Sequence, residues 1–137
     1  MTHSDPAAFP PDFAAAVERL AELTERFAAA AERVELWDAS VPTCPGWSAR
    51  ELVIHLGTIH AWAASAFGAD RAPEMPPFDD GGTSLPEWYR ARAAGLVVAL
   101  RAAGPDAPAW TLWGNRVAAF WARRQLHETA IHAYDLS

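Results

Sequence analysis

Apolar residues recur every three or four positions over residues 12–36, and this spacing constrains the fold more than any other feature of the sequence. Glutamate and arginine occupy most of the positions between them. Since an α-helix turns once in 3.6 residues, this spacing gives one continuous apolar face that another surface must cover. The segment therefore predicts a long amphipathic helix, packed against other helices. Its apolar residues are Phe13, Val17, Leu20, Leu23, Phe27, Ala31 and Val34.

Two further helix starts are marked by a serine that is followed three positions later by a glutamate. In such a capping box the serine oxygen accepts a backbone N–H of the first turn, and the glutamate accepts the N–H of the serine. Ser48 and Glu51 predict a second helix that runs to about residue 67. Ser84 and Glu87 predict a third, with Gly104 and the proline after it as the stop signal. A fourth helix is expected from about residues 115–117 to the end of the chain.

Length and composition favour one all-α domain. The chain has 137 residues, which suits a single domain over residues 1–137, and 51% of them are apolar, with many alanines and few Ile and Val. Residues 69–83 contain three prolines and two glycines and show no periodicity, so they are interpreted as a crossover loop. Extended, this loop reaches up to about 50 Å, whereas a helix of twenty residues is about 30 Å long. The second and third helices can then run parallel, which predicts an up-down-down-up four-helix bundle.

Charge and cysteine content exclude several classes of protein. All 11 basic residues are arginine, as is typical of GC-rich bacterial genomes, and 17 acidic residues bring the net charge to −6, so nucleic acid would be repelled. The one cysteine cannot form an internal disulfide, and residues 1–6 lack the features of a secretory signal, so we expect a cytoplasmic protein. Charged residues interrupt every apolar stretch, and no membrane span is expected.

The last helical segment carries a polar side that is separate from its apolar side. On it, Glu128 and His132 are neighbours, because four residues nearly complete a turn. In the second segment, His55 lies on a stripe that is expected to face inward, whereas His60 lies well off it. The polar side comprises Val117, Trp121, Arg124, Gln125, Glu128, Ile131, His132 and Asp135, the apolar side Ala119, Ala122, Leu126, Ala130 and Ala133, and the solvated side Arg123, His127 and Tyr134. The stripe of His55 comprises Leu52, Ile59, Trp62 and Ala66.

His55, Glu128 and His132 are candidate metal ligands. A Glu/His pair four positions apart is most often only a helix-surface contact worth about 0.2–0.5 kcal/mol, and a histidine among leucines is most often a hydrogen-bonded core residue. Together, however, the three would form a His, His, Glu set that leaves one position of a tetrahedral zinc open for water or substrate. His127 and Glu128 resemble the start of a zinc-protease HExxH motif. His127 lies five positions before His132, about 140° around the helix, so the two cannot share a metal.

The segments VPTCPGWSARELVIHLG and FWARRQLHETAIHAYDL together resemble the amino-terminal domain of the mycothiol-dependent maleylpyruvate isomerase family, within the DinB-like four-helix superfamily. The resemblance covers essentially the whole chain. It implies that His55, Glu128 and His132 hold a divalent metal, usually zinc, which binds the thiol of mycothiol, a low-molecular-weight thiol of actinobacteria. A metal-bound thiol loses its proton near neutral pH. The implied function is a metal-dependent, mycothiol-dependent isomerase or S-transferase that acts on a small electrophilic substrate.

Several residues near these ligands have more than one interpretation. Cys44 is either a reactive thiol or additional ligand, or part of a turn that docks Cys44 and Trp47 against the bundle and aims the helix that carries His55; the second is favoured. Arg124 and Asp135 orient the ligands, contact an anionic substrate, or form an internal ion pair that supports the helix. Arg124 is accordingly a candidate cofactor-binding residue.

The end of the chain and the enzymatic function also leave alternatives. Full members of the family commonly carry a second domain that contributes to thiol or substrate binding, whereas this chain ends at Ser137, soon after His132. The chain is therefore expected to be either a fragment of a two-domain protein or a minimal metal-binding module. The alternatives to an enzyme are a noncatalytic DinB-like domain that binds metal or a partner, with a homodimer through alanine-rich surfaces, and a structural bundle without metal.

Overall fold

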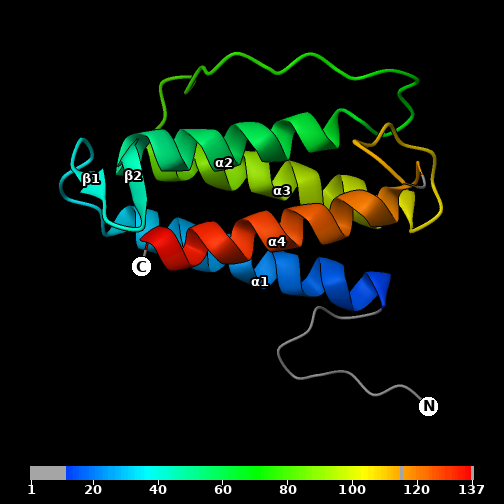
Figure 1. The fold of residues 1–137 in the computed structure, drawn as a ribbon, viewed down its shortest axis with the longest axis horizontal. Helices are drawn as coiled ribbons and strands as arrows, with labels where there is room; N and C mark the ends of the chain where they lie inside the picture. Colours follow the sequence, from blue (N-terminus) through cyan, green and yellow to red (C-terminus); the bar gives the residue numbers. More distant parts are fainter. Residues whose placement is uncertain (1–11, 115, 137) are drawn as a thin grey trace.

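A computed structural model describes residues 12–114 and 116–136, and Figure 1 shows its fold. Within this part the chain forms four α-helices and one short β-hairpin, so the predicted all-α four-helix bundle is confirmed. Two expectations concern residues outside the described part of the chain: that residues 1–6 lack a secretory signal, and that the fourth helix starts near Asn115. The elements are α1 (Phe13–Glu32), β1 (Ser40–Val41), β2 (Cys44–Ser48), α2 (Ala49–Ala64), α3 (Leu85–Ala103) and α4 (Ala118–Leu136).

The helix starts follow the capping signals in the sequence. The side chain of Asp12 accepts a backbone N–H in the first turn of α1. At α2 both bonds of the capping box are present, with the Glu51 N–H donating to Ser48 Oγ at 3.1 Å and the Ser48 N–H donating to Glu51 Oε1 at 3.0 Å. At α3 the Glu87 N–H donates to Ser84 Oγ at 3.3 Å. These short polar side chains satisfy N–H groups that have no partner inside the helix.

Two helices end earlier than predicted. Helix α1 ends at Glu32 rather than near Leu36, because Leu36 is 74% exposed and finds no core to pack against. Helix α2 ends at Ala64 rather than near Phe67, because Phe67 pairs with Ala109 in a β-bridge that draws the backbone out of the helix. Both segments had apolar residues at suitable spacing, but neighbouring segments determine where each helix stops.

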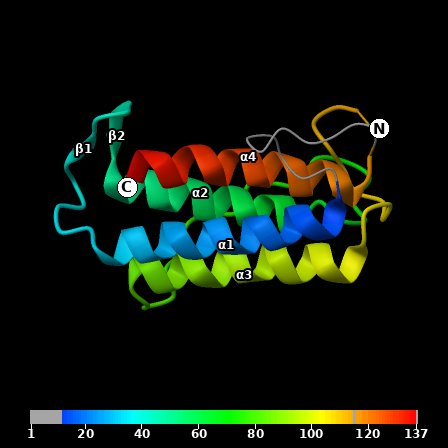
Figure 2. The same ribbon diagram turned by 90° about the horizontal axis from the view of Figure 1, so that it is seen from below.

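Figures 1 and 2 show how the helices lie. Helices α2 and α3 run in one direction and α1 and α4 in the other, while the segment between α2 and α3 passes back along the bundle outside α2. The indole Nε1–H of Trp62 donates to the carbonyl oxygen of Pro73 at 2.8 Å and fastens this segment to α2. The C-terminal end of α4 lies beside β2 and the start of α2. This arrangement brings together segments that are about 90 positions apart in the sequence.

The hydrophobic core has two halves along the bundle. One half includes Leu20 and Trp121, and the other includes Phe27 and Tyr89, all with almost no exposed surface. Helix α2 carries Gly57 where the Trp88 ring of α3 lies against it, and a Cβ at this position would overlap the ring. Among the described residues, no helix combines the length and apolarity needed to cross a membrane.

The hairpin of β1 and β2 was not predicted as strands. Its register pairs Val41 with Cys44 and Ser40 with Ser48. Strand β1 has only two residues, too few to show an alternating pattern, and β2 contains Pro45 and Gly46, which are typical of turns, so only a turn was expected here. The docking expected for this segment is present at Cys44, because Cys44 Sγ and Thr43 Oγ1 donate to the Asp135 carboxylate of α4.

Candidate metal centre

The three predicted ligands lie together between α2 and α4. One possible ligand atom from each of His55, Glu128 and His132 lies within 4.8 Å of the other two. The rings of His55 and His132 face each other edge to face, with centroids 5.5 Å apart and planes at 86°. The structure therefore gathers two imidazoles and one carboxylate, all partly buried, from two different helices.

The carboxylate of Glu128 is held on both sides. Its Oε2 lies 3.4 Å from His132 Nε2, and its Oε1 lies 3.5 Å from Nη2 of Arg124, one turn earlier on α4. The guanidinium of Arg124 also lies over the Trp113 ring, 5.3 Å from its centroid. His132, and to a smaller extent Arg124, lower the pKa of Glu128, so Glu128 is a carboxylate at neutral pH.

The two histidines differ in their electrostatic environment. Burial lowers the pKa of His55, and the neighbouring His132 lowers it further. In contrast, the hydrogen bond to Glu128 raises the pKa of His132, and Asp135 adds to this effect. At neutral pH His55 is therefore a neutral imidazole, the form that binds metals, while the carboxylates around His132 favour its cation and would equally favour a bound metal cation.

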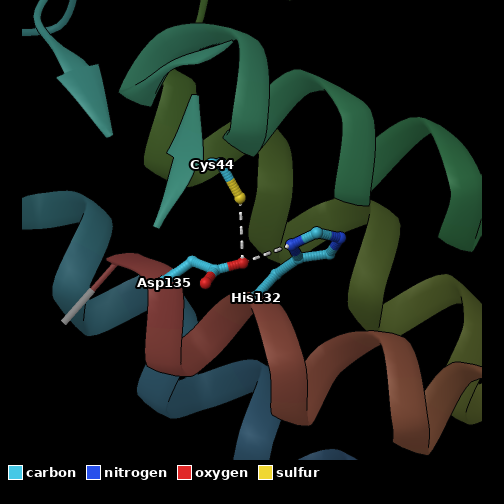
Figure 3. A group of neighbouring side chains, drawn as sticks. All are labelled: Cys44, His132 and Asp135. Carbon is cyan, nitrogen blue, oxygen red and sulfur yellow. Dashed lines mark hydrogen bonds and ion pairs between the residues drawn. The ribbon is translucent and has the colours of Figure 1, made fainter. Parts of the chain in front are cut away.

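Asp135 connects His132 to the hairpin, as Figure 3 shows. Its side chain is only 8% exposed. Its Oδ2 accepts hydrogen bonds from Nδ1 of His132 and from Sγ of Cys44, each at 3.1 Å, and its Oδ1 accepts the Thr43 hydroxyl at 2.7 Å. Burial acts to raise the pKa of Asp135, but these three donors outweigh it and lower the pKa. Nδ1 of His132 is thereby occupied, which leaves Nε2 as its ligand atom.

Cys44 belongs to a second group of possible ligands, with His132 and Asp135. This group shares His132 with the first. The hydrogen bond to Asp135, followed by burial, raises the pKa of Cys44, so the thiol keeps its proton and acts as a donor. Arg124 and Asp135 do not pair with each other. Arg124 pairs with Glu128 and Asp135 with His132, so each contacts a predicted ligand.

His60 is the residue that the sequence analysis misplaced. It is fully buried, with Nδ1–H donating to Gln125 Oε1 at 2.8 Å and Nε2 accepting the Tyr89 hydroxyl at 3.0 Å. The predicted inward stripe of α2 is therefore wrong in rotation: Ile59 and His55 are only partly buried. The buried face also has helical spacing, so the pattern allowed this rotation as well as the predicted one. This face comprises Ala49, Leu52, Val53, Leu56, Gly57, His60 and Ala63.

Helix α4 is oriented largely as its pattern indicates. His127 and Tyr134 are exposed, as expected, and His127 is not part of either group of possible ligands. Ile131, one position before His132, is 58% exposed. The polar side of the helix thus continues from the buried Gln125 through the half-buried ligands to solvent, so the centre can be reached from outside.

Comparison with known proteins identifies a family. The model of a protein family described as "Mycothiol maleylpyruvate isomerase N-terminal domain" matches residues 13–137. This range includes all four helices and the three clustered donors. No curated protein and no solved structure matches the chain.

Proposed function

The chain belongs to the family of mycothiol maleylpyruvate isomerase N-terminal domains, and from this premise we propose that His55, Glu128 and His132 hold a divalent metal for thiol chemistry with mycothiol. Zinc is the metal proposed. When bound, such a metal would lower the pKa of a thiol on its open position, so that the thiol is present as thiolate near neutral pH. The proposed activity is that of a metal-dependent isomerase or S-transferase.

The observation that carries this proposal is the convergence of the three donors. Ligands that each lie about 2.0–2.2 Å from one ion are at most about 4.4 Å apart, so donors that lie within 4.8 Å of one another need only small side-chain movements to share an ion. Two imidazole nitrogens and one carboxylate oxygen are also a ligand set found at catalytic zinc sites, where the remaining position takes water or substrate. The chemistry and the placement of these residues therefore fit the metal that the family implies.

The surrounding residues are proposed to keep the donors ready for use. Asp135 accepts the Nδ1 proton of His132, which selects the tautomer with Nε2 free to bind. Arg124 pairs with one carboxylate oxygen of Glu128, and the other oxygen of Glu128 lies next to His132. Arg124 is also the proposed contact for the thiol cosubstrate, since its side chain is 37% exposed at the edge of the centre.

Two reactions of the thiol are consistent with this centre. In isomerisation, sulfur bonds to one carbon of the cis double bond of maleylpyruvate and the electron pair moves onto the conjugated carbonyl. The new single bond rotates, and the pair returns as the C–S bond breaks, which gives fumarylpyruvate. In S-transfer, the sulfur instead stays bonded to an electrophilic carbon.

Metal and thiol binding test the proposal directly. We expect the purified protein to hold about one divalent ion per chain, and mycothiol to raise the melting temperature of the metal-loaded protein but not of the chelator-treated protein, because only a ligand of the folded state stabilises it. Metal content is measured by elemental analysis and melting by calorimetry. Full thiol-dependent activity without metal would refute the proposal, and bound metal with no response to mycothiol would favour the noncatalytic alternative.

Removing the charge of Asp135 is predicted to weaken metal binding. Asp135→Asn keeps the shape of the side chain but replaces a carboxylate by a weaker acceptor for His132 Nδ1–H, and such changes typically cost 10- to 100-fold in metal affinity, so roughly that loss is expected here. Competition with a chelating dye measures the affinity. The matched control is Asp38→Asn, since Asp38 is 86% exposed and pairs only with Arg50 among the described ion pairs. Equal affinities of the two variants would contradict a positioning role.

A further inference from the structure

A cleft lies beside His55 on the outer side of α2. Its volume is about 470 Å³, which is within the range of small-molecule sites. The side chains that line it next to His55 come from β2, α2 and the segment between α2 and α3. They are Trp47, Glu51, Ile54, Thr58, Ile59 and Met75.

The cleft is adjacent to the candidate metal centre through His55. The His55 ring contacts the ring of Trp47 edge to face, with centroids 4.8 Å apart and planes at 86°, and the ring of His132 edge to face, with centroids 5.5 Å apart and planes at 86°. On the other side, Met75 belongs to the segment that the hydrogen bond from Trp62 to Pro73 fastens to α2. A molecule in the cleft would therefore lie next to a thiol held at the centre.

The walls of the cleft are apolar and carry no positive charge. Among the described residues that line it there is no arginine, and the chain has no lysine. The one acidic residue, Glu51, already accepts the Ser48 N–H at 3.0 Å in the capping box of α2. The arginine of the centre, Arg124, is not among the lining residues.

We propose that this cleft binds the electrophilic substrate, and that this substrate is an uncharged, largely apolar molecule; the inference rests on the proposed function of the centre. A carboxylate in the cleft would lose hydration without gaining an arginine or lysine partner, and it would lie near the negative charge of Glu51. The proposed metal would not replace that partner, because the Glu128 carboxylate and the bound thiolate together balance its two positive charges. A dicarboxylate such as maleylpyruvate would carry this penalty twice. Of the two reactions proposed above, the cleft thus favours S-transfer to a neutral electrophile.

The step can be written for an aryl chloride activated by nitro groups. The thiolate sulfur attacks the ring carbon that bears chlorine, a C–S bond forms, the C–Cl bond breaks, and chloride leaves with the bonding electron pair. The thiol proton passes to the buffer, and no oxidant or reductant is required. Trp47, Ile54 and Ile59 would surround the ring of such a substrate.

Binding of two unreactive probes tests the cleft without requiring turnover. Meta-dinitrobenzene is neutral, and the dinitrobenzoate with the same nitro positions differs by one carboxylate. We expect the neutral probe to bind roughly tenfold tighter or more, with methyl NMR shifts confined to Ile54, Ile59 and Met75. Equal or tighter binding of the benzoate, or shifts elsewhere, would overturn the inference. Metal content is measured on the same samples, so failure of the centre is recorded separately.

A charged variant and its neutral match sharpen the test. Thr58→Arg places a cation in the cleft and is expected to shift the preference toward the benzoate by roughly tenfold, whereas Thr58→Gln, of similar length, is expected to leave the preference as it is. The same comparison is repeated in turnover with mycothiol as the thiol. The two electrophiles are 1-chloro-2,6-dinitrobenzene and 4-chloro-3,5-dinitrobenzoate, which differ by one carboxylate para to chlorine, and each catalysed rate is divided by the uncatalysed rate. A preference that Thr58→Arg does not move, or faster turnover of the carboxylate by the unaltered protein, would contradict the assignment.

Discussion

His55→Ala is expected to weaken divalent metal binding by roughly 100- to 1,000-fold. Structural zinc sites with four ligands bind with about 10–16 kcal/mol, or about 3 kcal/mol per ligand, and each 1.4 kcal/mol is a factor of ten. Since His55 is the one donor from α2, its loss leaves Glu128 and His132 on a single helix as the proposed pair. Isothermal titration with zinc measures the affinity.

The control for this prediction is His127→Ala. His127 is exposed on α4 and is adjacent to Glu128 in sequence, but it is not in either group of possible ligands. The His127→Ala protein should therefore keep the metal affinity of the unaltered protein. Because His55 is only partly buried, the metal-free His55→Ala protein should keep its helical circular dichroism. Unchanged zinc affinity in the folded variant would show that the three donors do not share an ion.

Acid is expected to destabilise the fold by about 3 kcal/mol through His60 alone. Burial lowers the pKa of His60 to about 4, against about 6.5 in the unfolded chain. The unfolded state therefore takes up this proton first. The stability that His60 contributes is fully present above about pH 6.5, and it is lost as the pH falls from there to about 4, at about 1.4 kcal/mol per pH unit.

The pH dependence of a His60→Gln variant isolates this effect. The variant loses stability at pH 7, because Gln125 and Tyr89 lose their hydrogen-bonding partner. Its free energy of unfolding should, however, fall less than that of the unaltered protein between pH 7 and pH 4, by about 3 kcal/mol. Urea unfolding with a chelator present measures both proteins without a contribution from metal. Parallel pH profiles would show that His60 does not stay neutral in the folded chain.

The helix starts could be predicted because their causes are local. Ser48 and Glu51 satisfy each other's N–H groups within one turn, and the bond from Glu87 to Ser84 likewise spans three positions. The pairing of Glu128 with His132 is local in the same sense, since it needs only an α-helix. Helix ends were less predictable, because contacts with distant segments, such as that between Phe67 and Ala109, decide them.

The rotation of α2 could not be read with certainty from its pattern. Apolar residues surround more than half of this helix, so Ile54 and Ile59 compete with Leu56 and Val53 for the core, and the spacing fits more than one orientation. His60 occupies the most buried side because α3 and α4 supply its partners, which no feature of α2 reveals.

By itself the sequence determined the helical class, the capped helix starts and which side of α4 carries the Glu and His, since each depends on residues within a few positions of one another. Only the tertiary structure decided that His55 meets this pair, that Cys44 and Thr43 hold Asp135 across 91 and 92 positions, and that His60 is buried. The physical reason is that periodicity specifies a face of a helix, whereas packing of all four helices specifies what that face contacts.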